Sequence, residues 1–224
     1  MTSVYSQEKN KLKFGKIQKP DFEITSPVLD SNANAIIIAD IGSSEFEGNN
    51  KGWFKLVYRR HKRIKILNKN GFDAAAISIY LYTDGQDAER IKELKANTYS
   101  VEGDKVITTS IESKSVFEER VSKNLIEKKF TFPAVKVGSI IEYTYTMESD
   151  FMFNLQPWSF QSEYPCILSE YEVKIPDFFG CLLRIKIKCS RQLGCRHKRC
   201  IISICSFTYH RCIICLHFYP RIQV

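Results

Sequence analysis

Apolar and polar residues alternate most clearly between Ile141 and Met147. Every second residue of this stretch is apolar or aromatic, and the residues between them are polar. The apolar set is Ile141, Tyr143, Tyr145 and Met147, and the polar set is Glu142, Thr144 and Thr146. A period of two predicts a half-buried antiparallel strand, with the apolar set in the core and the polar set facing solvent.

Shorter apolar or alternating runs recur on both sides of this strand. They predict strands at residues 35–41, 53–67, 76–82, 98–101, 105–111, 130–132 and 168–175. Other segments are expected to be a polar loop (42–52), a hairpin turn (68–71), one or two helical turns or an irregular connection (84–96), and a short amphipathic helix (116–128). Many short strands without repeated helices predict an all-β or mainly β fold, an antiparallel β-sandwich with one or two short helices.

The predicted strand at residues 53–67 has a cationic face. Phe54, Leu56, Tyr58, Ile64 and Ile66 share one parity. The other parity carries the cationic residues Lys55, Arg59, His61, Arg63 and Lys65. This face either binds a phosphate or an anionic glycan, or is a solvated strand face, which is the more common case. Trp53 and Trp158 complete the candidate ligand face if they stack on a sugar; otherwise they are core aromatics bordering apolar runs.

Composition divides the chain near residue 180. Residues 181–224 hold seven of the eight cysteines, three of the four histidines and no Asp or Glu. Nine of the 33 Lys and Arg residues also lie there, so residues 1–180 carry 24 basic and 25 acidic side chains, a net charge of −1. The net charge of +8 and the pI of about 9.0 therefore belong to the tail, and no nucleic-acid partner is expected for the body.

The tail has two interpretations. Its candidate zinc ligands are Cys212, Cys215, His210 and His217, but only the two cysteines have the close spacing typical of zinc sites. Seven cysteines are also an odd number for a disulfide framework. The loss of every acidic residue favours an out-of-frame or non-native tail, so that the domain is truncated at its C-terminal end. No metal and no cofactor are expected on this interpretation.

The chain thus divides into an N-terminal remnant or arm (1–12), one β-sandwich domain (13–180) and the cysteine-rich basic tail (181–224). No stretch is apolar over a length that could span a bilayer, because His210, Arg211 and His217 interrupt the best candidate, residues 200–220. Residues 1–6 are either the remnant of a signal peptide that starts upstream or an ordinary polar start, since they lack the charged and apolar regions of a complete signal.

Cys166 and His61 are the only cysteine and the only histidine of residues 1–180. A nucleophilic cysteine needs a neighbouring base, but His61 lies on a strand face crowded with cations. Cys166 is therefore expected to be an inert core residue that precedes Ile167 and Leu168. No catalytic residue is assigned, and no enzyme activity is expected.

Several residue groups occur together in a characteristic order. They are Tyr58–Leu67; Ala96-Asn97-Thr98-Tyr99 before Gly103; Phe130-Thr131-Phe132-Pro133 before Gly138-Ser139-Ile140-Ile141-Glu142-Tyr143; Trp158-Ser159-Phe160-Gln161; Tyr164-Pro165; and Ser169-Glu170-Tyr171 before Ile175-Pro176. From about residue 13 to residue 180, this order resembles bacterial domain-of-unknown-function family 3857, which lies N-terminal to transglutaminase-like domains in exported proteins. The resemblance implies a β-rich, non-catalytic module in a periplasmic or secreted protein. It also implies a downstream transglutaminase-like domain as partner, which would hold the Cys-His-Asp chemistry.

The expected function is a non-catalytic accessory module of an exported transglutaminase-like protein, acting in packing or in substrate presentation. Two alternatives stay open: an independent glycan- or peptide-binding module, and a zinc-binding protein if the Cys/His tail is genuine. The accessory module predicts no stoichiometric metal, whereas the glycan-binding module predicts binding that weakens with salt. The zinc protein predicts loss of structure on chelation.

Overall fold

The structure is a computed structural model that describes residues 12–24, 32–50, 52–160 and 162–174. It also describes the backbone of residues 201–208 and 211–217. Within these residues the protein is mainly β, as the alternating sequence pattern predicts. No described helix is long and apolar enough to cross a lipid bilayer.

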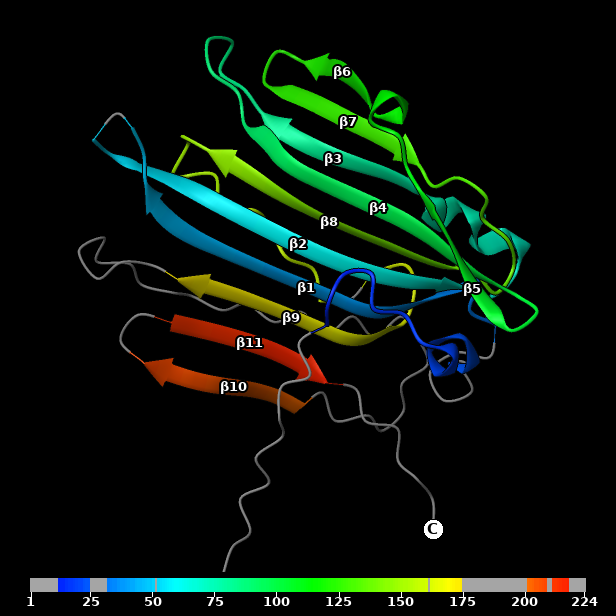
Figure 1. The fold of residues 1–224 in the computed structure, drawn as a ribbon. Helices are drawn as coiled ribbons and strands as arrows, with labels where there is room; N and C mark the ends of the chain where they lie inside the picture. The colour runs from blue at the N-terminus through cyan, green and yellow to red at the C-terminus, as the bar shows by residue number, and fades with distance from the viewer. Residues whose placement is uncertain are drawn as a thin grey trace, which may run out of the picture.

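Two sheets form the fold (Figure 1). The larger has eight strands in the order β10-β11-β9-β1-β2-β8-β4-β5. Its strands are β1 (Ala35–Gly48), β2 (Phe54–Ile66), β4 (Arg90–Glu102), β5 (Lys105–Ser110), β8 (Ile140–Ser149), β9 (Cys166–Lys174), β10 (Ile201–Thr208) and β11 (Arg211–His217). The smaller has the order β3-β7-β6, with β3 (Ala76–Tyr82), β7 (Leu125–Thr131) and β6 (Phe117–Ser122). The described residues also form three short 3-10 helices: η1 (Lys19–Glu23) before β1, η2 (Lys69–Ala75) between β2 and β3, and η3 (Ser113–Ser115) between β5 and β6.

The strand pairs of the described chain are antiparallel with one exception, the parallel pair β1–β9. A parallel pair needs a crossover connection rather than a tight turn. The long connection from β8 to β9, residues 150–165, supplies that crossover. It also carries Trp158 to the large sheet.

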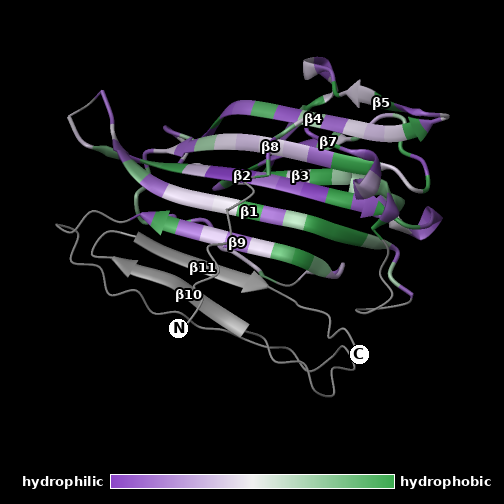
Figure 2. Cartoon of the chain, turned by 60° about the horizontal axis from the view of Figure 1, so that its bottom comes forward, coloured by the Kyte–Doolittle hydropathy of each residue, from purple (hydrophilic) through white to green (hydrophobic). Residues whose placement is uncertain are grey.

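The core lies between the two sheets. One hydrophobic cluster includes Ile79 and Phe130 from the small sheet together with Ile141, Tyr143 and Tyr145 from the large one. The rings of Phe130 and Tyr143 lie edge to face, 6.2 Å apart. The apolar set of β8 is therefore buried as its alternation predicts, and Figure 2 shows the corresponding bands of hydrophobic and hydrophilic residues along the strands of the large sheet.

Two predicted irregular segments are in fact parts of strands. The polar loop predicted at residues 42–52 is wrong, because β1 continues to Gly48 and pairs there with β2. Two of its polar residues, Ser43 and Glu47, are cross-strand partners of the cations Arg59 and Lys55 of β2, so polarity does not mark a loop here. The helix or irregular connection predicted at residues 84–96 is wrong from Arg90 onward, where β4 begins, and only residues 84–89 form an irregular connection. A bulge between Ile91 and Glu93 breaks the period of two and gives Ile91 and Leu94 a helix-like spacing of three.

Two predictions for connections are also wrong. The amphipathic helix predicted at residues 116–128 is instead β6 followed by most of β7. β6 is an edge strand with all six residues exposed, so its sequence has no alternation by which it could be recognised. The hairpin turn predicted at residues 68–71 is instead the N-cap and the first three residues of η2, and this helix connects β2 to β3, which belongs to the other sheet.

The tail contributes a hairpin to the described backbone. β10 and β11 are antiparallel neighbours, and β11 continues the large sheet beside β9. Residues 175–200, where the domain was expected to end, lie outside the described residues. The proposed division at residue 180 is therefore untested.

Candidate functional site

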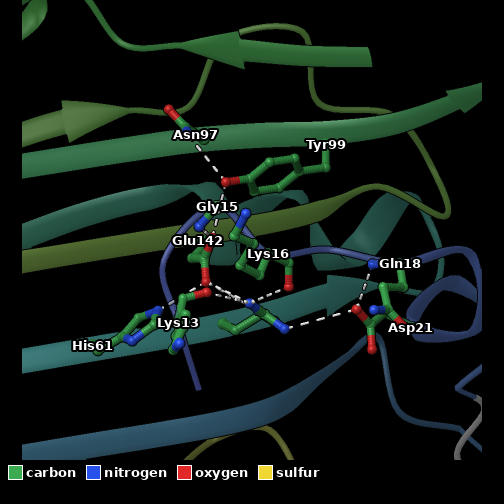
Figure 3. A network of polar contacts seen from close by, with 10 residues as sticks. Lys13, Gly15, Lys16, Gln18, Asp21, His61, Asn97, Tyr99 and Glu142 are labelled. Carbon is green, nitrogen blue, oxygen red and sulfur yellow. Dashed lines mark hydrogen bonds and ion pairs between the residues drawn. The ribbon is translucent and has the colours of Figure 1, made fainter. Parts of the chain in front are cut away.

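A polar network lies on the outer face of the large sheet, on the side away from the small sheet, and Glu142 of β8 is its centre (Figure 3). The strand register places Glu142 beside Arg63 of β2 on one side and Asn97 of β4 on the other. One carboxylate oxygen, Oε1, lies 2.8 Å from His61 Nε2 and accepts hydrogen bonds of 2.7 and 3.1 Å from Arg63. The other, Oε2, accepts 2.9 Å hydrogen bonds from the Tyr99 hydroxyl and the Gly15 amide.

The Glu142 side chain is completely buried, whereas the sequence pattern predicted that it faces solvent. Burial alone would raise the pKa of this carboxyl, but the hydrogen bonds from His61, Gly15 and Arg63 outweigh it and lower the pKa. The pKa of the Tyr99 hydroxyl is raised to about 12, first by burial and also by the neighbouring Glu142 charge. Glu142 therefore stays ionised and Tyr99 stays a hydrogen-bond donor at neutral pH.

The N-terminal segment covers this network. Residues 12–24, called the strap below, run across β2 and make most of their polar contacts through the main chain. Besides the Gly15 amide, Arg63 Nη2 donates to the carbonyls of Lys13 and Lys16 at 3.3 and 3.1 Å. Lys65 Nζ donates to the carbonyls of Phe22 and Ile24.

The predicted cationic face of β2 is real, but its Arg63 and Lys65 end is covered rather than solvated. Arg63 and Lys65 are only 3% and 5% exposed because the strap lies over them. Arg59 is bound to two carboxylates of β1, Glu45 and Glu47. Within the described residues, the cations of the candidate ligand face are thus held by carboxylates or by strap carbonyls rather than left open to an anion.

A second charged cluster lies on the opposite, inner face of the same strands. Asp40 of β1 accepts two hydrogen bonds from Arg60, at 2.8 and 2.6 Å, and lies 3.3 Å from Lys62 Nζ. Burial lowers the pKa of Lys62 while the Asp40 charge opposes that shift. The guanidinium of Arg60 also lies 5.0 Å from the Trp158 ring centroid, within the range of a cation–π contact.

The two tryptophans do not form one ligand face. Trp158 stacks on Tyr171 with ring centroids 4.9 Å apart, and its Nε1 donates to Ser169 at 3.2 Å. It belongs to the inner face and packs against the core. Trp53 is 59% exposed in the β1–β2 turn and is not a core residue. The structure therefore brings Arg59, His61, Arg63 and Lys65 together on the outer face and separates Trp158 from them.

Cys166 lies with the inner cluster, whereas His61 lies on the other face of the sheet. The thiol is 4% exposed and donates to the Leu168 carbonyl at 3.2 Å. Burial, with a smaller contribution from the Asp40 charge, raises its pKa to about 12. His61 is the only histidine whose side chain the structure describes, so no Cys–His pair occurs among the residues whose side chains are described.

The candidate zinc ligands fall at the limit of the described chain. Cys212, Cys215 and His217 belong to β11, where only the backbone is described, and His210 lies outside the described residues. Among the residues whose side chains are described, no group of three or more His, Cys, Asp or Glu could hold a metal ion. The zinc alternative is not tested by this part of the chain.

The sequence analysis missed three residues that organise these clusters: Asp40, Tyr99 and Glu142. Two of them carried a signal. Asp40 is the one acid in the otherwise apolar run of residues 35–41, and Glu142 is the one charge in the alternating stretch from Ile141 to Met147. A lone charge inside a strongly apolar strand indicates a buried ion pair, because an unpaired charge there would be too costly.

Fold and site together define a mainly β domain in which two sheets enclose the core and charged clusters lie paired on both faces of the larger sheet. The family model of DUF3857, described as a domain of unknown function with a solved structure, matches residues 54–192. The chain belongs to this family. Because β1 pairs along its length with β2, the folded unit begins before the matched range.

The solved structures that resemble the chain include two of low sequence identity. One, a "putative protease" from Parabacteroides distasonis, has 10% sequence identity and a TM-score of 0.49 over 84% of this chain. This chain spans only 41% of the length of that structure. The other, a "putative nutrient binding protein" from Legionella pneumophila, has 12% identity and a TM-score of 0.36, covering 88% of this chain and 67% of its own length. No curated protein matches the sequence.

Proposed function

We propose that the chain is a non-catalytic accessory module of an exported protein that also carries a transglutaminase-like domain. Its role is to pack against that domain or to present substrate to it. Membership of the family supports the modular role. The family match covers neither export nor a transglutaminase-like partner. Both parts of the proposal are supported by the sequence resemblance described above.

The state of Cys166 is the observation that carries the non-catalytic assignment. A cysteine nucleophile must be available as thiolate and must lie beside a base. Cys166 is buried, its pKa is raised to about 12, and the described histidine lies on the other face of the sheet. These properties support a structural thiol.

Site-resolved alkylation tests this assignment. The folded protein is treated with iodoacetamide near neutral pH, and Cys166 is followed by peptide mass spectrometry so that the tail cysteines do not interfere. We expect Cys166 to be labelled at least about 100-fold more slowly than in the urea-unfolded chain, since the thiolate fraction falls about tenfold per unit of pKa and access is also blocked. Labelling of the folded protein as fast as the unfolded chain would contradict the assignment.

The DNA sequence downstream of codon 180 tests whether a transglutaminase-like domain follows. If residues 181–224 are out of frame, the DNA after codon 180 should encode further alternating strands in another frame, with acidic residues restored and cysteines scarce. A transglutaminase-like domain with its Cys, His and Asp should follow. Closure of both other frames soon after codon 180, or one bound zinc whose removal unfolds the chain, would instead favour a genuine zinc-binding tail.

A further inference from the structure

We infer that the outer face of β2 and β8 is a peptide-binding site, and that the strap is the ligand that this chain supplies to it. This inference does not rest on the accessory role proposed above. It concerns what the Glu142 network recognises, whether or not a second domain follows. The occupant is the segment 12–24, bound within one chain or donated by a second copy.

The donors and acceptors of this face match a polypeptide main chain. Arg63 and Lys65 donate to four strap carbonyls, and Glu142 accepts from one strap amide. The strap supplies a matching shape: a turn in which the Lys16 amide donates to the Lys13 carbonyl at 3.2 Å, with Gly15 at a φ of 80°. Few residues other than glycine adopt this φ readily, so position 15 selects for glycine.

Side chains of the strap add selectivity at three points. The ring of Phe14 lies 6.0 Å from the ring of His61. Asp21 lies 3.8 Å from Arg63 and caps its own helix η1 by accepting from the Gln18 amide at 2.8 Å. Lys19 pairs with Asp104 at 2.8 Å. The preferred ligand is therefore a peptide with an aromatic residue, a glycine directly after it and an acid six residues further on.

The site is organised without its ligand. Three of the four partners of Glu142 (His61, Arg63 and Tyr99) come from the large sheet and not from the strap, so we expect Glu142 to keep these bonds when the strap is absent. Lys65 differs, because its partners among the described residues are the two strap carbonyls. Without the strap, the site would thus present the preformed Glu142–Arg63 pair beside Lys65, which would lack its carbonyl acceptors. A peptide main chain would supply carbonyls to Arg63 and Lys65 and an amide to Glu142.

The test weakens the internal strap and offers the same segment in trans. Gly15→Pro removes the amide donor and the positive φ in the full chain but leaves β2 and β8 unchanged. A fluorescent peptide of residues 12–24 is then titrated against this variant and against the unaltered chain, followed by anisotropy. A tethered ligand acts at an effective concentration of about 1 mM. We therefore expect the variant to bind the peptide at least about tenfold more tightly than the unaltered chain.

Two controls make the result specific. The same peptide carrying Gly15→Pro should not bind, because it lacks the turn and the donor to Glu142. Adding Lys65→Met to the Gly15→Pro chain should weaken binding of the unaltered peptide by at least about tenfold, since it removes two hydrogen bonds to carbonyls.

If Gly15→Pro does not fold, or if hydrogen exchange shows its strap still protected, the Phe14→Ala/Asp21→Asn chain replaces it in the same titration. That variant loses the ring and ion-pair contacts but changes no residue of the sheets. Failure of a folded, strap-released variant to bind the peptide overturns the inference. Equal binding of the Gly15→Pro peptide also overturns it, because the main-chain contacts would then not be what is recognised.

Discussion

At the scale of single residues, Glu142 joins three strands and the strap through one carboxylate. Its side chain has no exposure to solvent, and two cationic or potentially cationic groups and a hydroxyl of the sheet point to it. Removing one partner of a buried ion pair is costly because the other charge is left uncompensated. The polar positions of β8 are therefore not equivalent, although the sequence pattern treats them alike.

Glu142→Gln should destabilise the protein by about 3–5 kcal/mol, because the neutral amide leaves the Arg63 charge buried without its partner. The matched control is Glu119→Gln, which breaks an exposed pair with Lys129 and should cost about 0–1 kcal/mol. Urea titration of both variants measures the free energies of unfolding. A loss at Glu142 no larger than the loss at Glu119 would show that the network does not hold the fold.

Acid should weaken the protein through the same carboxyl. The pKa of Glu142 is lowered on folding, so its contribution is complete above the unfolded value of 4.5 and is lost as pH falls through the folded value. The pKa values of Glu45 and Glu148 are lowered as well, so part of the loss remains in any Glu142 variant. The free energy of unfolding should fall between about pH 6 and about pH 3.5 by less in Glu142→Gln than in the unaltered chain. An identical fall in both would refute this assignment.

At the scale of elements, β1 pairs with β2 and β9 and carries acidic side chains on both of its faces. Its outer face carries Glu45 and Glu47 to Arg59, and its inner face carries Asp40 to Arg60. Between these, Gly42 leaves space for the ring of Trp158. A Cβ at Gly42 would lie 2.3 Å from a ring carbon of Trp158, whereas a Cβ at Gly48 would meet nothing within 4 Å.

Gly42→Ala should therefore destabilise the protein by about 1–3 kcal/mol, the usual cost of overpacking, and should displace Trp158 from its stack on Tyr171. Gly48→Ala in the same strand should change stability by no more than about 0.5 kcal/mol. Thermal unfolding gives the stabilities, and a red shift of tryptophan emission in Gly42→Ala alone reports the displacement. Equal effects at both glycines would mean that Trp158 does not pack on β1.

At the scale of the whole molecule, the small sheet covers the inner face of the large sheet, and the core lies between them. Phe130 of β7 reaches Tyr143 of β8 across the two layers, and Phe132 lies 6.3 Å from the same ring. Both phenylalanines are almost fully buried. Phe117 of β6, in the same small sheet, is 69% exposed.

Phe130→Ala should cost about 3–5 kcal/mol, because it leaves a cavity where the two sheets meet. Phe117→Ala removes the same side chain from an exposed position and should stay within about 0.5 kcal/mol of the unaltered chain. Chemical denaturation of the two variants makes the comparison. Similar losses for both would indicate that the small sheet does not pack on the large one as described.

The sequence by itself determined the mainly β class, the strands at β2, β3 and β8, and the buried face of Ile141, Tyr143 and Tyr145. These follow from local rules, because successive side chains of a strand point to opposite faces. It also indicated that Cys166 is a core residue, since its apolar neighbours are adjacent in the chain.

Only the tertiary structure decided which polar face is buried. A period of two separates the faces of a strand but does not say what covers each of them. Glu142, Arg63 and Lys65 are buried because the strap, 39 or more residues away in sequence, lies across β2 and β8. Likewise, β6 pairs as an edge strand through backbone hydrogen bonds to β7, which leave no apolar pattern in the sequence. Burial by a distant segment and pairing through the backbone are non-local, so local periodicity contains neither.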